Sequence, residues 1–420
     1  GMQALTRRWM ESDGSNERRV QWSAYLLGLI CFFDGLANSM LVGKSIAPLA
    51  ERAGVSRQRL AYIVDSTSSA VACVAVISTW IAYQLSMIRE GLDLAGLEAQ
   101  PFGLFLQSIP FNFYCWFTLI LLAVVISRNW NIGPMRRTAT RQFDEAMEPS
   151  TTTPSHAVSA IVPLIVLIGG LLIGLYGNGV EGAWFPLSLR KISDAYGRAD
   201  AALVLVCVSA VAGLAAYLMN VWPIKKNGGD AATIFTDGVI SLFKPVLILI
   251  SAWLLSSTLK ELKATEVLTS MLTGNIAPAF FPMLVFLTGA MISFSTGTSW
   301  GTMGILMPLA LPVALGFSDG ELSTLIHATI AAVFSGAVFG DHCSPFSDTT
   351  IVSSISCGIE PMEHVKTQMP YALIAAGVAL FLGFLPIGLG LNPFIALVLG
   401  GFVLVSLPFL FQKRGDHETF

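Results

Sequence analysis

Long apolar stretches follow one another along most of this chain, and shorter polar stretches separate them. Roughly ten of these stretches approach the ~20 apolar residues that a helix needs to cross a bilayer. Hydrophobic residues make up 54% of the chain and charged residues only 12%, against roughly 25% charged residues in soluble domains. The pattern predicts an all-α polytopic membrane protein. The approximate bounds of the segments are 22–48, 60–88, 101–127, 156–177, 200–222, 238–259, 277–316, 321–357, 370–390 and 393–411.

Three of these segments are interrupted by polar residues. The interruptions hold Asp34 and Asn38 in the first segment, residues 293–302 in the seventh and residues 340–350 (G-D-H-C-S-P-F-S-D-T-T) in the eighth. Hydrocarbon penalises unpaired polar groups, so such a run persists only where it packs against protein, lines a cavity or binds an ion. Interrupted segments in both halves of a transporter are the best sequence indication of its binding site. We therefore expect discontinuous or re-entrant helices whose interruptions meet around one cavity.

The placement of lysine and arginine predicts which loops face the cytoplasm. Arginines lie in the long polar stretch 128–155 and on both sides of the first segment. Re-entrant hairpins at 22–48 and within 277–357 would reconcile these positions with a cytoplasmic linker. We expect a multi-pass protein of the cytoplasmic (inner) cell membrane. Its predicted parts are a polar N-terminal segment at 1–21, a first membrane bundle at 22–127, a cytoplasmic linker at 128–155, a second membrane bundle at 156–411 and a cytoplasmic tail at 412–420.

Asp341 and Asp348 are the first candidates for ion binding. They are seven residues apart, and an unbroken helix would place them on one face, but Gly340 and Pro345 argue against an unbroken helix. A break frees backbone carbonyls, and these together with Asp, Ser and Thr oxygens form a site for a hard cation. The alternative is a helix end at the membrane surface, capped by Asp and Ser/Thr side chains.

Two further polar patches supply hydroxyl and carboxylate oxygens. The run 296–304 combines glycines with Thr and Ser hydroxyls, which are neutral oxygen ligands; helix packing through small residues is its alternative. In the first half, Asp34 and Asn38 share a helix face, and Asp65 opens a second patch unless it only caps a helix. One such patch in each half indicates an internal pseudo-repeat.

Other functions are disfavoured by the same residues. His342, Asp341 and Ser344 are too close in sequence to form a catalytic relay across a cleft, so an enzyme is not expected. The cysteines form no C-x-x-C pair and do not meet the spacing of a zinc site, so no cofactor is expected. His327 lies in an apolar run and is interpreted as a packed histidine rather than a proton relay. No basic patch suggests nucleic acid.

Several of these motifs resemble the NhaC-type sodium/proton antiporter family. They are S-T-G-T-S-W-G-T at 295–302, V-F-G-D-H-C-S-P-F-S-D-T-T-I-V-S-S at 338–354, F-F-D at 32–34, N-S-M-L-V-G at 38–43 and S-R-Q-R-L-A-Y-I-V-D-S-T at 56–67. The resemblance implies a helical transporter with inverted repeats that exchanges Na+ for H+. It also implies that the polar residues of the broken segments bind the ion, namely Asp34, Asn38, Asp65, Ser66, Thr67, Thr296, Thr298, Ser299, Asp341, Ser344, Asp348, Thr349 and Thr350.

The expected mechanism needs no covalent chemistry. Burial disfavours the charged form of a carboxylate, so a buried aspartate can exchange a proton for Na+ near neutral pH, and competition for the same carboxylate couples the two flows. Na+ is expected at Asp348, Asp341, Thr298 and Ser299, with Thr349 as a further neutral ligand and Asp65 as the partner from the other half. Because the family includes members that move amino acids or carboxylates, coupled transport of a small organic solute stays the alternative. A homo-oligomer stays possible, and lipid is the expected surrounding.

Overall fold

The computed structural model describes four stretches of the chain. The stretches are 17–138, 158–226, 230–267 and 275–415, apart from residues 33, 77, 189–190, 193–194, 196–197, 242, 244–245, 248–249, 252–253, 255–256, 259–260, 264–266 and 319–320. Much of the predicted N-terminal segment, linker and tail, namely 1–16, 139–155 and 416–420, therefore lies outside the described residues.

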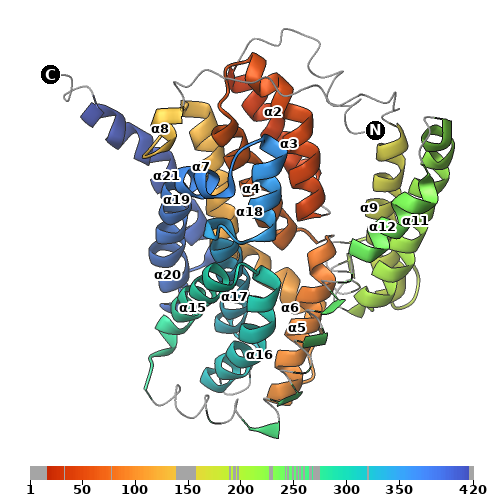
Figure 1. Ribbon diagram of the computed structural model, residues 1–420. Helices are drawn as coiled ribbons and strands as arrows, with labels where there is room; N and C mark the ends of the chain where they lie inside the picture. The colour runs from red at the N-terminus through yellow and green to blue at the C-terminus, as the bar shows by residue number, and fades with distance from the viewer. Residues whose placement is uncertain are drawn as a thin grey trace. The chain divides into compact units, whose positions relative to one another are not determined.

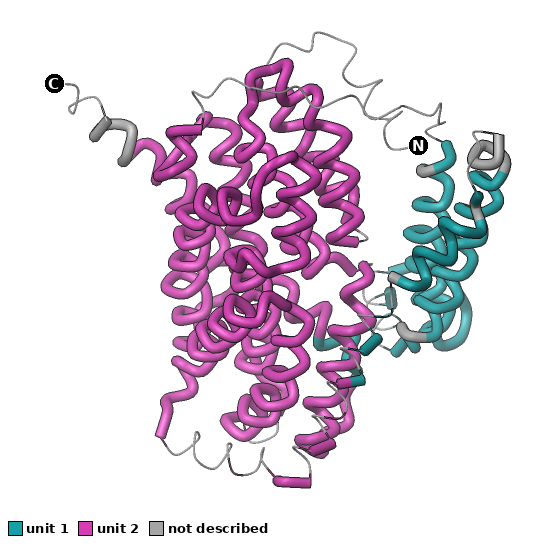
Figure 2. The backbone as a smooth tube through the Cα atoms, in the orientation of Figure 1, with its two compact units in different colours: residues 1–13, 100–104, 148–250 teal, residues 14–99, 105–147, 251–420 magenta. Residues whose placement is uncertain are grey.

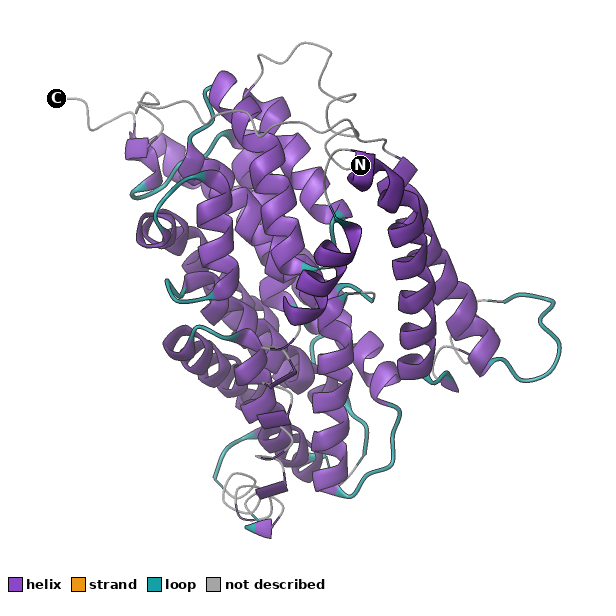
Figure 3. Ribbon diagram, turned by 45° about the vertical axis from the view of Figure 1, so that its right-hand side comes forward, coloured by secondary structure: helices purple, strands orange, loops and turns teal. Residues whose placement is uncertain are grey.

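All regular structure among the described residues is helical, and none of these residues forms a β-strand (Figure 3). The all-α prediction is confirmed. The helices, labelled in Figure 1 where there is room, are α2 (Glu17–Ile30), α3 (Gly35–Arg52), α4 (Arg57–Val74), α5 (Thr79–Ala95), α6 (Pro101–Ser108), α7 (Phe113–Arg128), α8 (Met135–Thr138), α9 (Val158–Gly179), α11 (Ala201–Lys226), α12 (Ala231–Ser241), α15 (Phe281–Thr296), α16 (Ser299–Phe317), α17 (Thr324–Cys343), α18 (Asp348–Cys357), α19 (Pro361–Val378), α20 (Leu385–Gly388) and α21 (Pro393–Gly415), with short 3-10 or π turns at Ile109–Phe111, Pro278–Phe280 and Ala379–Phe384.

Among the described residues, six helices are long and apolar enough to cross a membrane, and there are up to eight spans if each of two bent helix pairs counts as one. This agrees roughly with the predicted segments and makes the chain a multi-pass membrane protein. The bent pairs are α4 with α5, and α6 with α7. The six single spans are Ile161–Gly179, Leu203–Val221, Pro278–Thr296, Ser299–Phe317, Thr324–Cys343 and Pro361–Gly388.

The chain divides into two compact units, coloured separately in Figure 2. The smaller unit contains α9, α11 and α12. Within it α9 packs closely on α11, because Gly170 and Gly174 leave room for Val208 and Val204. The larger unit comprises residues 14–99, 105–147 and 251–420 and holds every predicted site residue. This larger unit contains helices from both expected bundles, 22–127 and 156–411. The boundaries of the two bundles stay a prediction.

Four helix breaks organise the larger unit. Between α2 and α3, Asp34 caps the second helix by accepting a hydrogen bond from the Ala37 amide at 2.7 Å. Between α15 and α16, Gly297 adopts a left-handed φ of 65°, which favours glycine, and Thr298 caps α16. The other two breaks separate α4 from α5 and α17 from α18. The prediction of discontinuous helices is confirmed.

The order of these half-helices occurs twice. α2, α3, α4 and α5 form one series, and α15, α16, α17 and α18 form the other. In each pairing, the second helix of one series packs on the fourth helix of the other: α3 packs on α18, and α16 packs on α5. Figure 1 shows the α3–α18 pair toward one end of the unit and the α5–α16 pair toward the other. This is the relation expected of an inverted repeat.

Candidate ion-binding site

Two aspartates lie buried where α4, α17, α18 and α19 pack together. Asp65, in the middle of α4, is 0% exposed, and Asp341, in the last turn of α17, is 2% exposed. A buried carboxylate is costly unless hydrogen bonds or a bound cation compensate the charge. The surroundings of each aspartate therefore indicate what each one can bind.

Hydroxyl groups surround the Asp341 carboxylate. Ser347 donates to Oδ1, while Thr349 at 2.9 Å and Ser69 at 3.3 Å donate to Oδ2. A hydroxyl oxygen has lone pairs as well as a hydrogen, so each of these groups can rotate to face a cation. A carboxylate with several neutral oxygens is a ligand set for a hard cation. Among the described residues, no group of three or more His, Cys, Asp or Glu is arranged to hold a metal ion.

Nitrogen donors dominate the surroundings of Asp65. Its Oδ2 accepts hydrogen bonds from Nε2 of Gln368 at 2.7 Å and from Nε2 of His364 at 3.2 Å. His342 Nε2 lies 3.8 Å from the same oxygen. Ser353 donates to Oδ1 at 3.2 Å, and the Thr350 hydroxyl lies 3.5 Å from Oδ2. The two nitrogen groups that are hydrogen-bonded to this carboxylate, from Gln368 and His364, both present N–H bonds.

The two aspartates belong to one connected network. The Thr350 hydroxyl lies 3.5 Å from Asp65 Oδ2 and donates to the Asp341 backbone carbonyl at 3.1 Å. The Gln368 amide, which donates to Asp65, also donates to the backbone carbonyl of His342. Binding or release of an ion at one carboxylate can thus affect the other through Asp341 and His342, which are adjacent residues of α17.

Local sequence explains why these groups converge. α17 ends at Cys343, just before Pro345, and α18 begins only at Asp348. Ser347 precedes α18, and its hydroxyl makes no capping bond there but donates to Asp341. On α19, His364 and Gln368 are four residues apart and therefore share a helix face.

His342 sits between hydroxyls of two other helices. Its Nδ1 lies 2.8 Å from the Tyr114 hydroxyl on α7, and its Nε2 lies 3.2 Å from the Ser66 hydroxyl on α4. Both ring nitrogens therefore have partners. Ser66 thus joins the predicted cluster, through His342.

The remaining predicted residues of the first half hold helices together. Asp34 caps α3 and accepts a hydrogen bond from the Thr79 hydroxyl at 2.8 Å, which ties the start of α3 to that of α5. Asn38 is buried and donates to the backbone carbonyls of Gly28 and Thr67. The Thr67 hydroxyl bonds within its own helix.

In the second half, the structure brings the two predicted polar runs together. A methyl group at Gly297 would lie 2.9 Å from the carbonyl carbon of Phe346, so the two helix breaks touch. Thr296 is exposed and bonds to its own helix, Thr298 caps α16, and Ser299 is buried. Within the described part of the chain, none of these three hydroxyls is hydrogen-bonded to Asp65 or Asp341.

Asp348 and Ser344 lie in the break itself. Asp348 is exposed, in the first turn of α18, and differs in this from the two buried aspartates. The Ser344 hydroxyl is buried and accepts a hydrogen bond from the Phe346 amide at 3.4 Å. Thr349 and Thr350, by contrast, contact the carboxylate network directly.

Several residues of the network were not predicted from the sequence, namely Ser69, Ser347, Ser353, His364 and Gln368. His364 and Gln368 precede the expected segment 370–390. Pro361 at the first turn of α19, followed by the four-residue spacing of His364 and Gln368, is the signal that indicates an earlier helix start.

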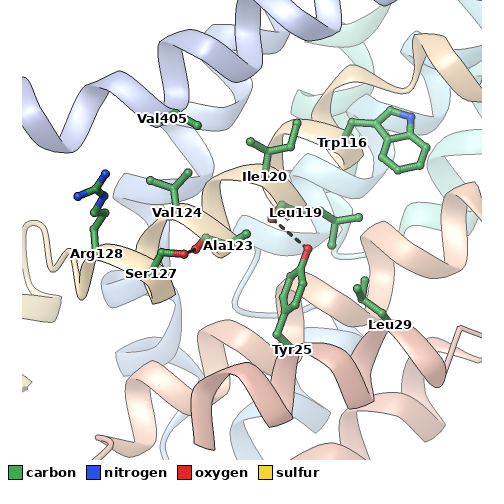
Figure 4. A pocket seen from close by; sticks show the side chains of 10 residues that line it. All are labelled: Tyr25, Leu29, Trp116, Leu119, Ile120, Ala123, Val124, Ser127, Arg128 and Val405. Atoms are coloured by element: carbon green, nitrogen blue, oxygen red, sulfur yellow. Dashed lines mark hydrogen bonds between the residues drawn. The ribbon is translucent and has the colours of Figure 1, made fainter. Parts of the chain in front are cut away.

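A separate cavity of about 560 Å³ lies between α2, α7 and α21 (Figure 4). Its lining is almost entirely apolar, with Tyr25, Ser127 and Arg128 as the polar exceptions. No predicted site residue lines it.

Discontinuous helices that meet around buried carboxylates are the architecture of secondary transporters. Residues 71–388 match the model of the Na+/H+ antiporter family, which is most of the chain. The chain belongs to this family, whose members are antiporters. The expectation of an NhaC-type transporter is confirmed.

Individual relatives agree with the family. An uncharacterized protein of Haemophilus influenzae is 29% identical over 410 residues, 97% of this chain and 78% of the relative. The Na+/H+ antiporter NhaC of Alkalihalophilus pseudofirmus is 28% identical over 43% of this chain and 37% of its own length. The malate-2H+/Na+-lactate antiporter of Bacillus subtilis is 30% identical over 38% of this chain and 33% of its own length.

A solved structure shows the same fold. The YdaH transporter of Alcanivorax borkumensis aligns with a TM-score of 0.57 at 14% sequence identity. The alignment covers 94% of this chain and 86% of that protein. The likeness concerns the arrangement of the helices alone.

Proposed function

We propose that this chain exchanges Na+ for H+ across the cytoplasmic (inner) cell membrane and that Na+ binds at Asp341. The observation that carries the proposal is the shell of three hydroxyls, from Ser69, Ser347 and Thr349, around one buried carboxylate. Its charge requires neutralisation, and the hydroxyls provide oxygen lone pairs for a cation. Family membership supports the same ions.

The end of α17 adds to the attraction for a cation. Asp341 lies in the last turn of this helix, where the helix dipole carries partial negative charge. Na+ entering the shell would displace the hydrogen bonds that the hydroxyls now donate. Movement of the half-helices on either side of the break then alternates the access of the site between the two faces.

Two other predicted groups stay in the proposal. Thr298 and Ser299 lie at the break that touches the one before α18, and Asp348 begins α18. These positions support their participation in an open state of the site. Asp65, the partner carboxylate from the other half, enters the proposal on the proton side of the exchange and not as a ligand of Na+. A homo-oligomer likewise stays a proposal.

The test uses the purified chain in lipid vesicles with a preset pH gradient. Addition of Na+ alone should collapse the gradient, and Asp341→Asn should abolish the effect. His327→Gln serves as a matched control. His327 lies on α17, as Asp341 does, but it stacks on the Phe111 ring and, in the described stretches of the chain, does not contact the carboxylate network. A gradient that persists in wild-type vesicles after Na+ addition contradicts Na+/H+ exchange.

A second candidate is coupled transport of a small organic carboxylate. Two observations favour it: the similarity to a malate/lactate antiporter, and the capped start of α16, since helix N-termini attract anions. In the same vesicles, a gradient that collapses only after malate or lactate is added with Na+ would establish this function instead.

A further inference from the structure

Asp65 is surrounded by groups that suit a proton and not a metal cation. An N–H bond, unlike a hydroxyl, offers no lone pair toward its acceptor, so it cannot become a cation ligand by rotation. Gln368 cannot exchange its amide nitrogen for its oxygen without loss, because Nε2 donates to two acceptors, Asp65 and the His342 carbonyl. Na+ at Asp65 would therefore face the hydrogens that Gln368 and His364 donate.

His364 provides a free base beside this carboxylate. Its Nε2 faces Asp65 Oδ2 at 3.2 Å, and its side chain is fully buried. Among the described residues, its other nitrogen, Nδ1, has no hydrogen-bond partner. With Nε2–H donated to the carboxylate, Nδ1 carries a lone pair, which is the atom that accepts a proton when imidazole becomes imidazolium.

We propose that the Asp65–His364 pair carries the transported proton, at a site distinct from the Na+ site at Asp341. The proton adds to the Nδ1 lone pair, Nε2–H stays on Asp65, and the resulting imidazolium is balanced by the carboxylate. Release reverses the same step, and no other bond changes. The inference rests on the proposed Na+/H+ exchange and assigns the two ions to different residues.

Other titratable groups facing Asp65 fit the role less well. They are Asp341, His342 and Cys343 on α17, Cys357 on α18, and Tyr114 on α7, which reaches the site through His342. His342 has both nitrogens occupied by hydroxyls and stands 3.8 Å from Asp65. A proton there would require the Ser66 and Tyr114 hydroxyls both to accept.

The network links the two ion sites in the way that antiport requires. Thr350 and Gln368 each connect Asp65 to residues 341–342. A positive charge on His364 and Na+ beside Asp341 would repel each other in a medium of low dielectric constant. Simultaneous occupancy is thereby disfavoured, and binding of one ion promotes release of the other.

The experiment separates Na+/Na+ exchange from Na+/H+ exchange in vesicles that contain the full chain. Radiolabelled Na+ is followed against unlabelled Na+ at equal pH, and Na+-driven proton movement is followed with a pH dye. Asp65→Asn and His364→Gln should lose Na+/H+ exchange to the level of empty vesicles and keep Na+/Na+ exchange. Asp341→Asn should lose both modes, and His327→Gln should keep both.

Acid sensitivity provides a readout that a structural role would not change. Protons should slow Na+/Na+ exchange in the wild type, and His364→Gln should abolish this slowing. If Asp65→Asn is not recovered folded, His364→Gln decides alone, since it keeps the carboxylate with its Gln368 and Ser353 donors.

Two results would overturn the inference. One is a folded His364→Gln variant that retains Na+/H+ exchange with wild-type acid sensitivity. The other is loss of both exchange modes in folded Asp65→Asn and His364→Gln, which would mean one shared site. Absence of both modes in the wild type would instead contradict the proposed function itself.

Discussion

Asp341 and Asp65 are the same residue type, equally buried and part of one network, yet their neighbours differ in kind. Asp341 is surrounded by hydroxyls, and Asp65 mainly by imidazole and amide nitrogens. Hydroxyls can donate or accept, whereas N–H groups only donate. Under the two proposals, the hydrogen-bonding capacity of the neighbours, and not burial alone, determines which ion each buried carboxylate holds.

The largest effect is expected from Asp341→Asn. The substitution keeps the shape and one oxygen of the side chain but removes the charge that Na+ needs. Transport of Na+ should fall to background in either exchange mode, measured with radiolabelled Na+. Normal exchange by a folded Asp341→Asn variant would remove the basis of the comparison.

Gln368→Leu should reduce the stability of the protein more than it changes the affinity for ions. It removes the shortest donor to Asp65 and leaves two buried acceptors without this partner, so the free energy of unfolding should fall by about 1–3 kcal/mol. Thermal unfolding in detergent measures this loss. Leu373→Ala, at an exposed position on the same helix, is the matched control. Equal unfolding temperatures of Gln368→Leu and wild type would contradict a tightly held Asp65.

Thr349→Val and Thr298→Ala distinguish a cation ligand from a helix cap. Thr349→Val removes a hydroxyl on Asp341 and should weaken Na+ affinity several-fold, corresponding to about 1 kcal/mol. Thr298→Ala removes a cap and should cost about 1 kcal/mol of stability. The Na+ dependence of transport and thermal unfolding measure the two effects. A Thr298→Ala variant that loses Na+ affinity as strongly as Thr349→Val would place Thr298 in the ligand shell.

Asp348→Asn should have the smallest effect. The side chain is exposed, and exposed substitutions usually change stability by less than about 0.5 kcal/mol. Na+-driven proton movement should continue at a reduced rate at most, because the buried Asp341 shell is intact. Complete loss of exchange in this variant would restore Asp348 as the principal carboxylate and would weaken the distinction drawn between Asp341 and Asp65.

The sequence alone determined the class of protein and the positions of its breaks. Apolar length specifies helices that need a bilayer. Gly297, which adopts a left-handed φ after α15, and Pro345, which follows the end of α17, indicate two of the breaks from local backbone properties alone. The energetic cost of Asp341 in an apolar segment likewise makes it a candidate functional residue without any knowledge of its neighbours.

Only the tertiary structure decided what each carboxylate contacts. Asp65 is 299 residues from His364 and 303 from Gln368, and Ser69 is 272 residues from Asp341. Local patterns carry no information on such distant pairs, since packing of α4 against α17, α18 and α19 creates them. The same applies to Asp348: seven residues from Asp341 in sequence, it is turned outward by the break that separates the two helices. Residue type could therefore identify candidate carboxylates, while burial and donor chemistry had to come from the fold.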